Sequence, residues 1–77
     1  MYFSKDEVIE LNDKRKFLVL DTALIDDKAY FKINKLDEEE NKTEEIEYVS
    51  VKNDNGRLYI NEHLKDSELA KITEFFA

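Results

Sequence analysis

The side chains best suited to catalysis are few in this chain. Its 77 residues include one histidine, His63, no cysteine, and three serines, Ser4, Ser50 and Ser67. Nucleophilic catalysis needs an activated serine, threonine or cysteine beside a base that a third group orients. No serine stands in a nucleophile-elbow motif, and His63 is expected at the surface between the last strand and the helix. The sequence therefore predicts a protein that is not an enzyme and has no catalytic residue.

Candidate ligands for metals and phosphates are also scarce. One histidine without cysteine does not make a transition-metal site. Around Gly56, the only glycine, Asn53, Asn55 and Glu62 take the third, fifth and twelfth positions of an EF-hand calcium loop, but Val51 occupies the first, where an acid is required. A hairpin turn is the favoured interpretation. A single glycine also excludes the phosphate-binding and dinucleotide-binding loops. We expect no cofactor and no metal, with carboxylate-based binding of a divalent ion as a weaker alternative.

Carboxylates are the abundant functional groups. Residues 1–35 hold seven basic and seven acidic residues, whereas residues 36–77 hold five and twelve, so the net charge of −7 arises in the second half. Glu45 and Glu47 would lie roughly 6.6 Å apart on one strand face. Such a surface repels nucleic acids and anionic lipids, so direct binding to either is not expected. A row of acids can nevertheless imitate a phosphate backbone and block a basic channel.

The elements that must position these groups are predicted from periodicity and turn residues. The apolar run Phe17 to Leu20 places large side chains on both faces of a strand, which must then be covered on both sides. Asp26 and Asp27 suit a two-residue hairpin turn. We expect a single α+β domain over 1–77: a five-stranded, mostly antiparallel meander curled toward a small barrel, with a C-terminal helix packed on it. The strands are expected at about 6–12, 16–25, 28–36, 45–52 and 57–61, and the helix at about 64–76.

Several finer expectations follow from side-chain alternation. In the second strand one face would carry Phe17, Val19, Asp21, Ala23 and Ile25, with Asp21 at a solvated rim. The third strand would have one buried and one wet face. Residues 37–45, which contain six acids, would form a loop. A slip in apolar phase between Tyr48 and Val49 indicates either a bulge or a change of covering partner.

The two ends of the chain leave some alternatives open. Residues 4–11 fit a strand or a helical turn, because Ser4 and Glu7 have the spacing of a capping box. In the helix, Asp66 or Ser67 would be the N-cap. Its buried stripe would be formed by Leu69, Ile72, Phe75 and Phe76. The basic cluster Lys14 to Lys16 is interpreted as solvated turn residues rather than as a phosphate site.

The chain resembles a family on several segments: Phe17-Leu18-Val19-Leu20-Asp21-Thr22, Asp26-Asp27-Lys28-Ala29-Tyr30, Val49-Ser50-Val51, Asp54-Asn55-Gly56 and Glu68-Leu69 to Phe75-Phe76. It is similar to small acidic proteins of unknown function from Gram-positive bacteria and their phages, in which an apolar run ending in Asp-Thr is followed by Asp-Gly-Lys-x-Tyr. Asp27 stands where that pattern has glycine. The resemblance implies no functional residue.

These observations predict a small acidic protein-binding module that acts by surface complementarity, alone or as a homo-oligomer, on an unidentified protein partner. The alternative is an acidic inhibitor that mimics nucleic acid, such as a phage anti-defence or anti-CRISPR protein. The absence of cysteine fits a reducing cytoplasm, and the first residues lack a secretory leader pattern. Tyr2 and Phe3 are further aromatic residues expected to be partly exposed. The residues expected to contact the partner are Asp37, Glu38, Glu39, Glu40, Glu44, Glu45, Glu47, Tyr48 and Tyr59.

Overall fold

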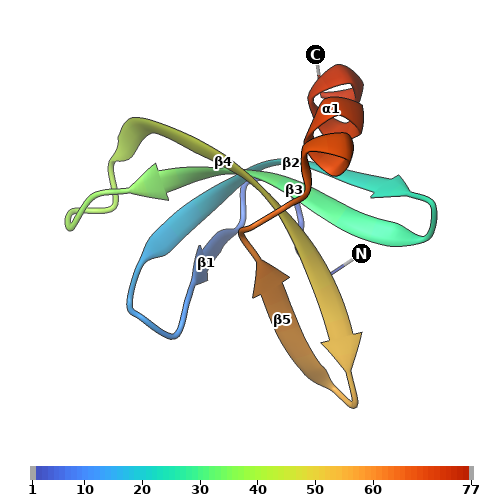
Figure 1. Ribbon diagram of the computed structural model, residues 1–77. Coiled ribbons are helices and arrows are strands. Elements are labelled where there is room, and N and C mark those ends of the chain that lie inside the picture. Colours follow the sequence, from blue (N-terminus) through green and yellow to red (C-terminus); the bar gives the residue numbers. More distant parts are fainter. Residues whose placement is uncertain (1, 77) are drawn as a thin grey trace.

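The computed structural model describes residues 2–76. Along these residues the chain forms β1 (Val8–Glu10), β2 (Lys16–Ile25), β3 (Lys28–Leu36), β4 (Lys42–Asp54), β5 (Arg57–Asn61) and α1 (Asp66–Phe75). The strands pair in chain order as one antiparallel sheet, which curls into a half-barrel. Figure 1 shows α1 standing over one face of this sheet, away from the free edges of β1 and β5. The predicted meander with its C-terminal helix is confirmed.

The inner face of the half-barrel holds the larger core. Phe3, from the segment before β1, lies on this face with its ring edge-on to Phe31, the ring centroids being 5.2 Å apart. Partly buried side chains of Leu11 and Ile60 complete the margin of this core. Its buried members come from the first four strands: Ile9, Phe17, Val19, Ala29, Phe31, Ile33, Val49 and Val51. Burial of these side chains is the main source of stability for a sheet this small.

The outer face carries a second, smaller core beneath α1. Ile72 of the helix is fully buried and packs against Ala23 and Tyr30 of the sheet. Partly buried side chains surround this contact: Ile25, Tyr48, Leu64, Leu69 and Phe76. The helix therefore covers the outer face through a single completely buried side chain and a ring of less buried ones.

A carboxylate of α1 fixes the helix to the sheet. Glu68 Oε2 accepts hydrogen bonds from Tyr30 Oη at 2.7 Å and from Lys28 Nζ at 2.9 Å. The bond from Tyr30 first, and that from Lys28 second, lower the pKa of Glu68 to about 2. Burial, followed by the hydrogen bond to Glu68, raises the pKa of Tyr30 to about 12. Both shifts favour the observed pair of an ionised carboxylate and a neutral phenol.

The central strand, β3, differs from the prediction of one wet face. Besides Phe31 and Ile33 on the inner face, Tyr30 and Asn34 on the outer face are buried. α1 covers Tyr30, and an irregular stretch of β4 covers Asn34. Polar residues were expected to mark a solvated face, but here each of the two forms hydrogen bonds that permit its burial.

The side-chain faces of β2 change at a β-bulge. Val19 pairs with Ile33 and Asp21 pairs with Lys32, so one extra residue of β2 lies between them. The prediction that Phe17, Val19, Asp21, Ala23 and Ile25 share one face is therefore wrong, since Val19 belongs to the inner core and Ala23 to the outer one. Asp21 is exposed at the bulge, as expected for a carboxylate at a solvated rim.

A second irregularity separates β3 from the start of β4. Asn34 pairs with Ile46 and Leu36 with Lys42, so three residues of β4 face one residue of β3. The Asn34 side chain, 2% exposed, donates to the carbonyl oxygens of Thr43 at 2.8 Å and Glu45 at 3.0 Å. Its amide thus replaces ladder hydrogen bonds that the bulge removes.

Two predictions about β4 need correction. The strand begins at Lys42, so the acidic segment expected to form a loop over 37–45 is a loop only over 37–41. No register shift separates Tyr48 from Val49, because they pair with consecutive residues of β3. The bulge interpretation is wrong at this point, and the phase change reflects two covering partners. Tyr48 faces α1, whereas Val49 faces the inner core.

The segment before β1 combines both alternatives left open by the sequence. Glu7 Oε1 accepts a hydrogen bond from the Ser4 backbone N–H at 3.0 Å, and the Glu7 N–H donates to the Ser4 carbonyl at 3.1 Å. A turn therefore precedes a strand of three residues, shorter than the expected 6–12. The capping-box spacing was a real signal, but it marks a turn and not a helix.

The start and the buried stripe of α1 also differ from expectation. The N-cap position is occupied by Lys65 and not by Asp66 or Ser67. Glu68 Oε1 lies 3.4 Å from the Lys65 backbone N–H and accepts its hydrogen bond. Phe75, expected in the buried stripe, is 59% exposed and meets Phe76 edge-on. The helix buries a narrower face than its sequence indicated.

Candidate functional site

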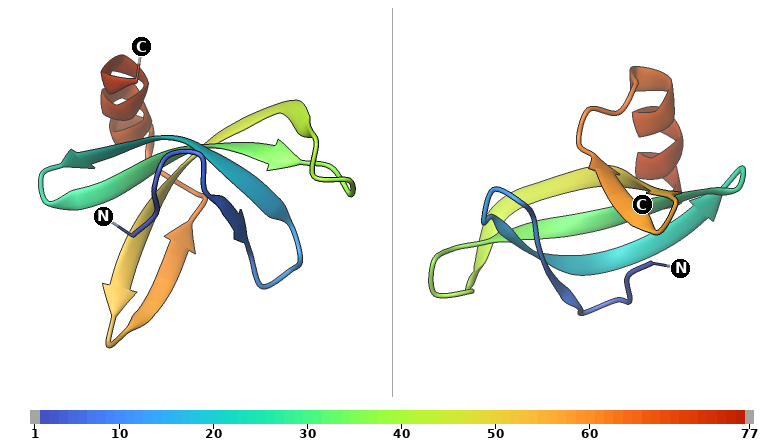
Figure 2. Two further views of the ribbon diagram at one scale, coloured as in Figure 1. Left: turned by 180° about the vertical axis from the view of Figure 1, so that it is seen from behind. Right: turned by 90° about the horizontal axis from the view of Figure 1, so that it is seen from below.

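The half-barrel has an open side between its two edge strands. In the described part of the chain β1 pairs only with β2, and β5 pairs only with β4. Figures 1 and 2 show these two edges on either side of the opening. A groove of about 510 Å³ lies here. We name it the β1/β5 groove, and its lining residues are Phe3, Glu10, Leu11, Asn12, Asp13, Arg15, Leu58, Tyr59, Ile60 and Glu62.

One ion pair bridges the end of this groove. Arg15, in the β1–β2 turn, donates from Nη1 to Glu62 Oε1 at 2.9 Å and from Nη2 to Oε2 at 2.7 Å. Its Nε donates to Asp13 Oδ2 at 2.7 Å, and the guanidinium lies 5.6 Å from the centroid of the Phe17 ring. This bidentate pair joins residues that are 47 positions apart in sequence. It links two parts of the sheet between which no strand pairing exists.

The ion pair shifts the pKa values of its members in opposite directions. The hydrogen bonds from Arg15 lower the pKa of Glu62, and those to Glu62 first and Asp13 second raise the pKa of Arg15. The backbone and side chain of Arg15 likewise lower the pKa of Asp13. All three groups are therefore charged near neutral pH, with two carboxylates against one guanidinium.

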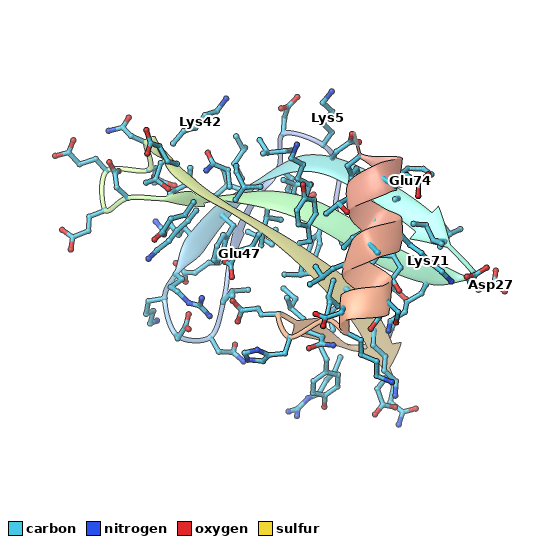
Figure 3. The ribbon with its side chains drawn as sticks, turned by 45° about the horizontal axis from the view of Figure 1, so that its top comes forward. Lys5, Asp27, Lys42, Glu47, Lys71 and Glu74 are labelled. Carbon is cyan, nitrogen blue, oxygen red and sulfur yellow. The ribbon has the colours of Figure 1, made fainter. Side chains whose placement is uncertain are left out.

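Glu47 adds a further carboxylate beside this cluster. It lies on β4 opposite Ile33, and Figure 3 shows it pointing from β4 toward the side where the β1–β2 turn lies. Burial first, and the negative charge of Glu62 second, raise its pKa. The arrangement combines an apolar groove with carboxylates that outnumber the single guanidinium. Such a surface can attract a cation and can bury apolar side chains.

The structure disperses the acidic residues predicted to contact a partner. Asp37 Oδ1 accepts hydrogen bonds from the N–H groups of Glu39 and Asn41, at 2.9 Å and 2.8 Å, and thereby shapes the β3–β4 loop. Glu40 lies 3.7 Å from Lys16 Nζ, and Glu45 lies 3.4 Å from Lys35 Nζ. For the remaining three, which are exposed, the described residues supply no ion pair: Glu38, Glu39 and Glu44.

The four aromatic residues expected to be partly exposed have different environments. Tyr59 on β5 is 50% exposed and lines the β1/β5 groove, and Tyr2 is also exposed. Tyr48 is half-buried and stacks on Phe76, with 5.9 Å between ring centroids. Phe3 is half-buried in the inner core. Tyr48 and Phe3 therefore support the fold, whereas the rings of Tyr59 and Tyr2 stay exposed.

Of the residues that line the groove, sequence reasoning named Tyr59 as a partner contact but missed the ion pair and the apolar side chains around it. Arg15 was interpreted with Lys14 and Lys16 as one basic cluster, but Arg15 pairs with Glu62, and Lys16 with Glu40. No local pattern connects Arg15 with Glu62, because their proximity depends on the curl of the whole sheet. Leu58 and Ile60 carried a signal, since they alternate along a short strand, but the exposure of Leu58 follows from the missing neighbour of β5.

The structure shows few other arrangements that could do chemistry. His63 is exposed, as predicted. Within residues 2–76 no group of three or more histidine, cysteine, aspartate or glutamate side chains is placed to hold a metal ion. Nor does that part of the chain contain a helix that is long and apolar enough to cross a membrane.

Comparison with known proteins identified no relative of this chain. No protein-family model matches the chain, and searches of curated proteins and of solved structures found no match. The resemblance to small acidic proteins of Gram-positive bacteria and their phages stays a prediction. The class that the fold defines is an open antiparallel half-barrel with one covering helix.

Proposed function

We propose that this chain is a non-enzymatic protein-binding module of the reducing cytoplasm, and that the β1/β5 groove is its binding surface. The observation that carries the proposal is the exposure of Leu58 and Tyr59, at 43% and 50%, on a strand with an unpaired edge. Apolar side chains beside free backbone groups are typical of surfaces that another chain completes. Tyrosine is also a frequent anchor of protein interfaces.

The groove supports binding better than it supports a reaction. Three of its four charged groups, those of Asp13, Arg15 and Glu62, are held in ion pairs, and neither His63 nor any of the serines lines it. The lining combines apolar side chains with charged ones, and both kinds contribute to protein interfaces. Complementarity of shape and charge is sufficient for such a role.

Nucleic-acid mimicry is the second candidate, and one observation favours it. Glu38, Glu39 and Glu44 are exposed near the β3–β4 loop, where they could enter a basic channel. The pairing of Glu40 and Glu45 with lysines weakens this candidate, because it partly neutralises the row of charges.

One capture experiment separates the two candidates. The full chain is used as bait in a lysate of its own cells, and bound proteins are quantified by mass spectrometry for three forms of the bait. If the module hypothesis holds, Tyr59→Ala loses the captured protein while a triple variant, Glu38→Gln with Glu39→Gln and Glu44→Gln, retains it. If the mimic hypothesis holds, the triple variant loses it and Tyr59→Ala retains it.

The choice of aromatic variant follows from the structure. Tyr59 has an exposed side chain, so Tyr59→Ala is expected to change the free energy of unfolding by no more than about 0.5 kcal/mol. Tyr48→Ala would remove the stack on Phe76 and disturb the helix. Equal capture by all three bait forms would contradict both candidates.

A further inference from the structure

We infer that the β1/β5 groove binds a peptide segment in extended conformation, in which lysine or arginine alternates with apolar residues, as an added strand on β5. This inference rests on the proposed function and names the chemistry of the partner. It depends on three features of the groove: free backbone groups, an apolar lining and excess negative charge.

The free backbone groups follow from the geometry of the β4–β5 hairpin. Asn55 and Gly56 have φ values of 53° and 86°, which form a two-residue turn between Asp54 and Arg57. In such a hairpin the flanking pair is hydrogen-bonded, and hydrogen-bonded pairs alternate with non-bonded ones along the ladder. The backbone N–H and C=O groups of Leu58 and Ile60 therefore point away from β4, toward the open side.

Edge β5 has a single charged residue, Arg57 at its first position, and otherwise lacks the features that normally prevent strand addition. Natural edge strands are protected by charged residues, proline, bulges or short length. Between Arg57 and Asn61 the sequence is Leu-Tyr-Ile, and β5 pairs with β4 without a register shift. Edge β1, in contrast, has only three residues and follows a turn in which Asp6 has a φ of 72°. We therefore place the added strand on β5.

The apolar lining accepts alternate side chains of such a peptide. Leu58 and Ile60 pair with Asn53 and Val51 across the hairpin, so both point to the inner face. Ile60 packs at the margin of the inner core, and Leu58 stays 43% exposed. An added strand presents every second side chain to this face and would cover Leu58.

The charge of the groove selects for a basic peptide. Glu10, Asp13 and Glu62 line it together with a single cation, Arg15, so the lining carries a net charge of −2. Three of the guanidinium N–H donors already bind Asp13 and Glu62, which leaves Glu10 without a cation within the described residues. A lysine or arginine at the rim compensates this excess.

The same charge disfavours the other occupants. A second copy of this chain brings a net charge of −7 to a surface that is already negative. Nucleic acid is repelled for the same reason. A basic extended peptide is the occupant that matches both the unpaired edge and the rim.

The test is an NMR titration of the full chain labelled with ¹⁵N. The probe is a short capped peptide in which lysine alternates with valine. A glutamate–valine peptide tests the charge requirement, and a lysine–valine peptide N-methylated at alternate residues tests strand pairing. We expect the first peptide to shift the amide signals of β5 and of the β1–β2 turn and to slow hydrogen exchange at Leu58 and Ile60. The other two peptides should leave these signals unchanged.

A matched pair of variants distinguishes the effect of a charge in the groove on peptide binding from the effect of the protein's net charge. Glu10→Gln and Glu39→Gln each remove one negative charge from an exposed side chain, but only Glu10 lines the groove. Glu10→Gln should weaken binding of the lysine–valine peptide about threefold, whereas Glu39→Gln should change it less than about 1.5-fold. Equal weakening by both variants would overturn the inference, because it would show attraction to net charge alone.

Other results of these experiments also test whether a basic peptide adds to β5 as a strand. Equal binding of the N-methylated peptide, or no binding of the lysine–valine peptide, overturns strand addition. So does concentration-dependent exchange protection of Leu58 without peptide, which would show β5 pairing with a second copy. Capture of a cellular protein that depends on Tyr59, together with no binding of the lysine–valine peptide, would leave the proposed function standing and reject only this partner chemistry.

Discussion

The two faces of the sheet are shielded from solvent in different ways. Both bury side chains of β3, but the outer face is covered by α1, whereas the inner face is covered by the curl of the sheet itself. The helix is fixed by Ile72 and by the hydrogen bonds of Glu68. The inner face ends at two unpaired strand edges, joined by the Arg15–Glu62 ion pair.

This difference separates the part of the molecule that serves the fold alone from the part that we propose as a binding surface. The outer face is closed by a segment of the same chain, so its side chains are committed to the fold. The inner face is complete only in its middle, where Phe3 contacts Phe31. At its margin, free backbone groups and exposed apolar side chains lie beside charged ones, and this is the part that we propose as the binding surface.

The largest expected effect concerns the outer face of the sheet, which α1 covers. Ile72→Ala removes the fully buried side chain of α1 and should reduce the free energy of unfolding by about 2–5 kcal/mol in urea titrations. Phe75→Ala, on the same helix but at a side chain that is 59% exposed, should change it by no more than about 0.5 kcal/mol.

A domain of this size can unfold completely on losing Ile72, so a milder change keeps the prediction measurable. Ile72→Val should cost about 0.5–1.5 kcal/mol. Equal effects of the changes at Ile72 and at Phe75 would show that α1 does not pack on the sheet in solution.

The second effect concerns the anchor of the helix and its pH dependence. Glu68→Gln should cost about 1–2 kcal/mol at neutral pH, because it replaces hydrogen bonds to a carboxylate by weaker ones. The folded pKa of Glu68, about 2, lies below its ordinary value of 4.5. Its stabilising contribution is therefore complete above pH 4.5 and is lost as the pH falls toward 2. Unfolding curves of wild type and Glu68→Gln should converge over this interval, and a constant difference would contradict the role of the ionised carboxylate.

The smallest effect concerns the inner face of the sheet. Here the substitution should raise the free energy of unfolding, whereas the preceding ones lower it. Burial and the charge of Glu62 raise the pKa of Glu47. The folded protein then binds the Glu47 proton more tightly than the unfolded chain, so stability is lost as the pH rises through the interval above 4.5. Glu47→Gln should accordingly stabilise the protein at neutral pH, by less than about 1 kcal/mol. Glu44→Gln, at an exposed position on the same strand, is the control and should not reproduce the gain.

The contrast between the faces also explains which features could be predicted. Local signals sufficed for the architecture, since the Asp26-Asp27 and Asn55-Gly56 turns both have the expected positive φ values. The bulges were harder to predict. The one between Val19 and Asp21 leaves no mark in the alternation of side chains, and Asn34 resembles a surface residue until the β4 carbonyls that it binds are known.

The groove itself could not be predicted from local patterns. Tyr59 was expected to contact a partner because it lies on a short strand, and its exposure agrees with that hypothesis without testing it. Arg15 and Glu62 meet only because the sheet curls, and the sign and spacing of neighbouring charges carry no information about that curvature. Tyr48 shows the reverse case, an aromatic residue interpreted as an anchor that the helix covers.

The central claim is that the half-barrel is open at β5, and hydrogen exchange of single amides measures this most directly. In the isolated protein at low concentration, the amides of Arg57 and Tyr59 face β4 and should exchange slowly, whereas those of Leu58 and Ile60 should exchange nearly as fast as in an unfolded peptide. Slow exchange at Leu58 and Ile60 under these conditions would show that the edge is already paired, and it would contradict the account.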